Sequence, residues 1–87
     1  MNRNEFFQKI LIEQFGSPTP LLDEVAKVYY PRLSRPKLLE KARLGKFPFK
    51  CFRLGEGQKS PYIVDIFSFA KFLSEKFSDG NSLNTGI

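Results

Sequence analysis

Basic side chains are concentrated in one third of the chain. Residues 32–59 hold nine Lys or Arg and only two acidic residues, Glu40 and Glu56, so this basic segment has a net charge of +7. The remaining residues hold five basic and seven acidic side chains, a net charge of −2, and the whole chain carries +5. Clustered cations neutralise phosphates and displace the counterions condensed on nucleic acid. The alternative is a charged surface that only faces water. The helices or strands that carry the charges must decide between nucleic-acid binding and this alternative.

Side chains for catalysis or metal binding are scarce. The sequence has no His and a single Cys, Cys51. Serine–imidazole and thiol–imidazole dyads require a histidine, structural zinc sites require several His or Cys ligands, and a disulfide framework requires paired cysteines. We therefore predict a protein that is not an enzyme and that holds no metal or other cofactor, with Cys51 as a small core residue.

The composition predicts one globular domain outside the membrane. Ten Phe and three Tyr in 87 residues supply large rings for a dense core, which a chain this short requires. Acidic and polar residues interrupt the N-terminal apolar run, unlike the continuous core of a signal peptide, and no stretch is long enough to span a bilayer. A cytoplasmic protein is therefore expected.

A first helix is expected over residues 3–15. Asn2 and Glu5 can form a capping box, and Gly16 is a typical residue for a helix end. Five apolar residues recur at helical spacing within it: Phe6, Phe7, Ile10, Leu11 and Phe15. This stripe predicts packing against the core of the domain, and the alternative is a contact between two copies of the chain.

A helix–turn–helix pattern follows over residues 22–44. Its first helix comes after the breaker sequence SPTP and ends before Pro31. Its second helix begins after Ser34, a good N-cap, has Pro36 in its first turn and stops at Gly45. Its inward residues are expected to be Leu38, Leu39 and Ala42, and its outward residues are basic: Arg35, Lys37, Lys41 and Arg43.

A hairpin and a last helix complete the pattern. Residues 49–54 and 61–64 predict two short strands joined by the turn sequence GEGQKS. This sequence does not fit a phosphate-binding loop, because it lacks the spacing and precedes a strand. Asp65 can cap a helix with Phe69, Ala70, Phe72, Leu73 and Phe77 toward the core, and residues 78–87 are expected to form a flexible tail.

This order of elements predicts an α+β, mostly helical fold: a winged helix–turn–helix domain over residues 17–77, with an extra N-terminal helix in residues 1–16 packed on it. In such domains one helix fits the major groove of double-stranded DNA, while the hairpin, or wing, reaches the flanking backbone. The base-reading candidates are Arg35 and Lys37. The phosphate-binding candidates are Arg32, Ser34, Lys41, Arg43, Lys46 and Arg53. The wing candidates are Gln58, Lys59 and Ser60.

Four segments between residues 21 and 76 resemble the pyocin activator PrtN family of prophage-borne regulators. They are the opening of the second helix at residues 22–26, the LxKxxxGxxP run at residues 39–48, the RL…GxQKS wing at residues 53–60 and the closing pattern at residues 64–73. The resemblance implies a sequence-specific, DNA-binding transcriptional activator of prophage or bacteriocin genes on a MerR-like winged-helix scaffold. No small-molecule effector is expected.

Other functions stay open on the residues alone. An excisionase, or recombination directionality factor, uses a similar scaffold to bend attachment-site DNA and would need the same basic residues. A small phage-encoded interaction module or inhibitor of a host protein is an alternative of another class, and RNA binding is a further one, although the aromatics fall at core positions. One small domain gives a limited DNA interface, so several copies on adjacent sites are expected to act together.

Overall fold

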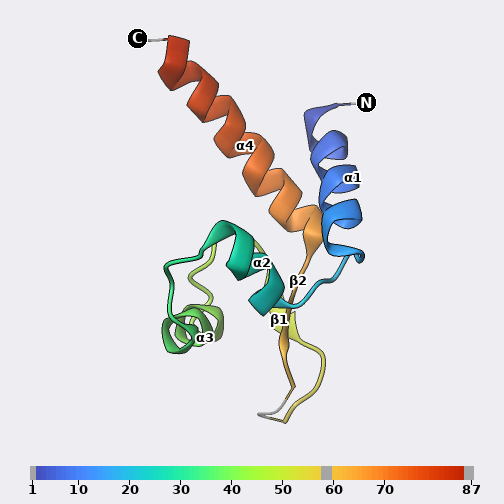
Figure 1. Cartoon of the computed structure of the whole chain (residues 1–87), viewed down its shortest axis with the longest axis vertical. Coiled ribbons are helices and arrows are strands. Elements are labelled where there is room, and N and C mark those ends of the chain that lie inside the picture. The colour runs from blue at the N-terminus through green and yellow to red at the C-terminus, as the bar shows by residue number, and fades with distance from the viewer. Residues whose placement is uncertain (1, 58–59, 86–87) are drawn as a thin grey trace.

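The structure, a computed structural model, describes the backbone of residues 2–57 and 60–85 and the side chains of that set up to Phe77. Its elements follow in the order α1 (Arg3–Phe15), α2 (Leu22–Tyr29), α3 (Arg35–Arg43), β1 (Cys51–Arg53), β2 (Tyr62–Val64) and α4 (Ile66–Thr85). The fold is therefore α+β and mostly helical, with a helix–turn–helix followed by a hairpin, which confirms the predicted winged helix. Figure 1 shows α3 and the hairpin at one end of the molecule and the free ends of α1 and α4 at the other.

Helix α1 begins and ends where its sequence predicts. The Asn2 side chain accepts a hydrogen bond from the Glu5 backbone N–H at 2.8 Å, which satisfies a donor that the first helical turn leaves free. At the other end Gly16 takes a φ of 75°, and its N–H donates to the carbonyl of Ile12 at 2.7 Å. Only glycine adopts this left-handed conformation without strain, so α1 stops here and the chain turns toward α2.

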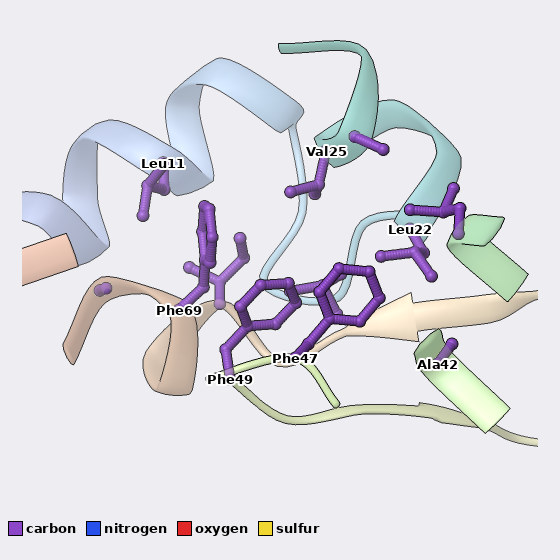
Figure 2. Packing of buried hydrophobic residues seen from close by; sticks show 12 residues of the cluster. Leu11, Leu22, Val25, Ala42, Phe47, Phe49 and Phe69 are labelled. Atoms are coloured by element: carbon purple, nitrogen blue, oxygen red, sulfur yellow. The ribbon is translucent and has the colours of Figure 1, made fainter. Parts of the chain in front are cut away.

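The core is built around Phe69 of α4. Its ring meets Phe49 edge to face at 4.7 Å between centroids and Tyr29 of α2 at 5.0 Å, while Phe47 stacks on Phe49 at 5.0 Å. Figure 2 shows the rings of Phe47, Phe49 and Phe69 packed among Leu11 of α1 and Leu22 and Val25 of α2. Such aromatic pairs contribute about 0.5–1.5 kcal/mol each beyond the burial of their area. The core therefore joins α1, α2 and α4 to the segment that leads into the hairpin.

The strands are shorter than the sequence predicts. Residues 47–49 form a bend in which Phe47 and Phe49 are buried and Pro48 is exposed, and β1 begins only at Cys51. The two strands are antiparallel, with Cys51 opposite Val64. On its other edge β2 pairs with Leu21, and the Val64 N–H donates to the carbonyl of Pro20 at 2.9 Å. The linker between α1 and α2 thus holds the hairpin against the domain.

Helix α4 starts as predicted but continues further. The Asp65 side chain accepts from the backbone N–H groups of Phe67 and Ser68, at 2.9 and 3.3 Å, as an N-cap should. The sequence predicts a tail from residue 78, but the helix runs to Thr85, so the predicted helix end was wrong. Extending an existing helix avoids the cost of nucleation, and a single glycine such as Gly80 costs only about 1 kcal/mol. Residues 86–87 of the predicted tail lie outside the described part of the chain.

Candidate nucleic-acid interface

Helix α3 lies on the surface and contacts the core through few residues. At the start of α3 the Ser34 hydroxyl oxygen accepts a hydrogen bond from the Lys37 N–H at 3.4 Å. Gly45, with a φ of 66°, follows the end of the helix. Leu38 and Ala42, one turn apart, are the two buried residues of the helix. Because so narrow a strip contacts the core, most of the circumference of α3 faces solvent.

A cleft of about 530 Å³ separates α3 from the hairpin. Arginines line it from both sides: Arg35 and Arg43 from α3, and Arg53 from β1. Ser60, in the hairpin loop, also lines the cleft and accepts a hydrogen bond from the Gly55 N–H at 3.0 Å. Its remaining lining is Leu22, Asp23, Pro36, Leu39, Glu40, Pro61 and Tyr62. The cleft can therefore bind an anion that contacts the helix and the hairpin together.

Arg35 is already engaged in the free protein. Its guanidinium lies 3.5 Å from the carboxylate of Asp23 on α2, and its side chain is 70% exposed. An ion pair this exposed contributes about 0–1 kcal/mol, because water screens both charges. A phosphate or a base edge can therefore displace Asp23 at little cost.

Three other cations of the basic segment lie over aromatic rings. The Arg53 guanidinium lies 5.0 Å from the centre of the Tyr62 ring, its partner across the two strands. Lys41 lies 5.7 Å from the Phe47 ring and Lys50 5.8 Å from the Phe52 ring. A cation over a ring face keeps its charge and its hydrogen-bond donors while losing some freedom of movement. These rings thus orient charges that remain able to bind an anion.

The remaining candidates surround the cleft or lie outside the described residues. Arg32, Ser34, Lys37 and Lys46 are exposed but do not line it, and Lys41 is half-buried beside Phe47. Gln58 and Lys59 of the wing fall outside the part of the chain that the structure describes. The structure therefore brings together Arg35, Arg43, Arg53 and Ser60 from the residues that the sequence singled out.

Two residues of α3 were missed or misplaced by the sequence pattern. Leu39 was expected in the core, but it is 38% exposed and lines the cleft, so that prediction was wrong. At 100° per residue it lies well to one side of the buried strip of Leu38 and Ala42, and the hairpin does not cover it. Glu40 also lines the cleft. Its position two residues from each buried residue was the available signal for an outward side chain.

The chain matches one known family over most of its length. Residues 8–79 match the family described as "Pyocin activator protein PrtN". The chain belongs to the PrtN family. The matched region begins inside α1 and ends inside α4, so it includes the helix–turn–helix, the cleft and the hairpin. No curated protein and no solved structure matches the chain, so the MerR-like and excisionase-like relationships stay predictions.

Cys51 lies in β1, outside the cleft lining of this PrtN-family protein. It is half-buried and packs against the core, and burial raises the pKa of its thiol, because the thiolate loses hydration there. Among the side chains of residues 2–57 and 60–77, no three His, Cys, Asp or Glu gather as potential metal ligands. No helix in residues 2–57 and 60–85 combines the length and the hydropathy needed to cross a membrane.

Proposed function

We propose that this chain is a non-enzymatic, sequence-specific DNA-binding protein that activates transcription of prophage-type genes. The observation that carries the proposal is the cleft in which Arg35 and Arg43 of α3 face Arg53 of the hairpin. The helix and the hairpin both carry arginines into the same cleft. This arrangement suits a DNA duplex, because its major groove and the flanking backbone lie side by side. The membership in an activator family supports activation over the excisionase function, which would use the same surface.

The dimensions of α3 fit the proposed contact. An α-helix with its side chains is about 10–12 Å across, which fits the roughly 12 Å width of the major groove of B-form DNA, and the nine residues of α3 span about 13 Å along its axis. With α3 in that groove, Arg35 and Lys37 in its first turn approach base edges. Arg43, Arg53 and Ser60 are then the candidates for phosphates on one side, and Arg32, Ser34, Lys41 and Lys46 for the backbone around α3. Phosphate contacts fix the register of the protein, and base contacts supply the sequence preference.

Self-association on adjacent sites is the second part of the proposal. Of the stripe predicted for this role, Leu11 is fully buried, and Phe7 and Phe15 pack against the core. Phe6 and Ile10, one helical turn apart on α1, remain exposed, and Phe6 lines an apolar pocket together with Phe77 of α4. We call these three side chains the apolar surface, and the free ends of their two helices lie away from α3 (Figure 1). We propose that copies on neighbouring DNA sites contact one another through this surface, which leaves each cleft free for DNA.

Selection from a random duplex pool tests the main proposal. The wild-type protein should enrich one short sequence motif, and its log affinity for that motif should fall with log salt with a slope on the order of −4 to −7. A triple variant, R35A/R43A/R53A, should weaken the slope by about two units, because Arg43 and Arg53 are the phosphate candidates, and should also relax the base preference, because Arg35 is a base-reading candidate. The matched control K9A/K27A/K71A removes the same charge from exposed positions of α1, α2 and α4.

The control variant should bind the selected duplex almost as tightly as the wild-type protein, because its three lysines lie outside the cleft lining. Equal losses in both triple variants would mean that net charge alone drives binding, and the proposed interface would be wrong. Failure to enrich any duplex motif would reject sequence-specific DNA binding.

A further inference from the structure

Glu40 is an acidic residue in the middle of a cationic surface. It lies on α3 and lines the cleft together with Arg35, Arg43 and Arg53. Its side chain is exposed, yet it makes no ion pair with any other residue that the structure describes. A carboxylate at this position repels phosphates and so opposes the electrostatic attraction that the surrounding arginines create.

The helix geometry places Glu40 farthest from the protein body. Leu38 and Ala42, the buried residues of α3, are two positions before and two positions after it. At 100° per residue both lie about 160° around the helix from Glu40. Lys37 and Arg43, each three residues away, lie on either side of it on the outward face. If α3 enters the major groove, Glu40 therefore points at the base edges, with a cation on each flank.

The chemistry of a carboxylate restricts what it can contact there. An ionised carboxylate only accepts hydrogen bonds, and in the major groove the exocyclic N4 amine of cytosine is the donor that glutamate and aspartate typically contact. We infer that Glu40 selects cytosine at one position of the bound site. The inference rests on the proposed DNA binding and names the base that this position of α3 recognises.

The cost of Glu40 to general affinity is part of the same inference. Its negative charge weakens binding to every sequence, and only a site that places the amine opposite it recovers the loss. A carboxylate that repels phosphates but accepts a hydrogen bond from a cytosine amine raises sequence specificity more than affinity. Glu40 thus lies between two cations that attract any duplex by their charge, and its carboxylate makes binding depend on the base opposite it.

The test uses the duplex selected by the wild-type protein and two variants at this position. Replacing the contacted cytosine should weaken wild-type binding about 10- to 100-fold. In E40A that penalty should vanish, and binding to unrelated duplexes should become tighter. In E40Q the preference should move toward adenine, because a carboxamide matches the donor and acceptor of its N6 and N7 atoms. Circular dichroism melts check that both variants fold.

E56Q is the matched control. It removes the same charge from an exposed position of the hairpin loop within the same basic segment. It should tighten binding to all duplexes while the cytosine preference stays intact. If the wild-type protein binds DNA and E40A keeps every base preference, the inference is overturned and the proposed function stands. If the wild-type protein binds no duplex, the proposed function fails before any variant is made.

Discussion

The two ends of this molecule use their side chains in opposite ways. The body formed by α1, α2, α4 and the segment at residues 46–50 is held by aromatic rings, with Phe69 fully buried at its centre. At the other end α3 buries only Leu38 and Ala42, β2 buries Ile63 and Val64, and most of the cations remain in solvent. At this end an exposed ion pair joins Arg35 to Asp23 of α2.

The aromatic body allows so small a chain to keep its charged surface available for binding. Because rings supply the stability in the body, the arginines and lysines are not needed as structural ion pairs. Unpaired surface charges contribute little to folding but give a field that attracts and orients a polyanion. Stability and DNA binding should therefore respond to different substitutions.

The largest effect is expected from a ring in the body. Phe69→Ala removes a fully buried side chain that contacts Phe49 and Tyr29, and should lower the free energy of unfolding by about 3–5 kcal/mol. Phe67→Ala is the matched control on the same helix, because that ring is 52% exposed, and its cost should stay below about 1 kcal/mol. Urea denaturation followed by circular dichroism measures both. Equal losses would remove the distinction between the aromatic body and the rest.

At the cationic end, Arg53→Ala should change binding without changing the fold. The residue lies exposed over the Tyr62 ring, so its loss should leave the urea midpoint almost unchanged. It should reduce the salt slope of DNA binding by about 1 and weaken all sequences alike, as expected for a phosphate contact. Lys71→Ala on α4 serves as the control with the same charge change. A relaxed base preference in R53A would instead make the hairpin a reader of sequence.

The exposed apolar residues of α1 allow the function of this end to be tested separately from DNA binding at the other end. The double variant F6S/I10S should bind one copy of the selected site as the wild-type protein does. On DNA with two adjacent copies it should lose a cooperative gain on the order of 10-fold, the equivalent of one to two half-buried side chains. Gel shifts on one-site and two-site duplexes measure the gain. Unchanged cooperativity would place the contact between copies elsewhere.

The smallest effect concerns the ion pair at the border of the two regions. Asp23→Asn frees Arg35 and removes a carboxylate from the cleft, so affinity for the selected duplex should rise by up to about 5-fold, the equivalent of 1 kcal/mol. Stability should change by less than about 1 kcal/mol. Glu24→Gln, at the next residue of α2 and outside the cleft lining, should leave affinity unchanged. Weaker binding by D23N would show that the pair positions Arg35 for DNA.

The helix ends of this fold can be predicted from short sequence patterns. Five residues mark helix ends as expected. Three of them accept hydrogen bonds from backbone N–H groups of the first turn: Asn2, Ser34 and Asp65. Gly16 and Gly45 take the positive φ at which a helix ends. The winged-helix order follows from these ends together with the hydrophobic spacing.

Positions that depend on distant neighbours could not be predicted. Leu39 has the spacing of a core residue, and only the placement of the hairpin leaves it exposed. Phe49 has the pattern of a strand residue, but packing against Phe69 places it in a bend before β1. The same holds for the cleft: the basic segment is visible in the sequence, whereas the convergence of Arg35, Arg43 and Arg53 depends on how α3 and the hairpin lie in space.

Side-chain NMR of arginine tests most directly that the cleft between α3 and the hairpin is the DNA-binding surface. In a ¹⁵N-labelled sample titrated with the selected duplex, the Nε resonances of Arg35, Arg43 and Arg53 should shift together and saturate at one duplex per protein. Arg3 lies on α1, where its guanidinium is over the Phe77 ring, and should keep its position as the internal reference. Shifts of Arg3 with the three cleft arginines unmoved would contradict the account and place DNA at the opposite end of the molecule.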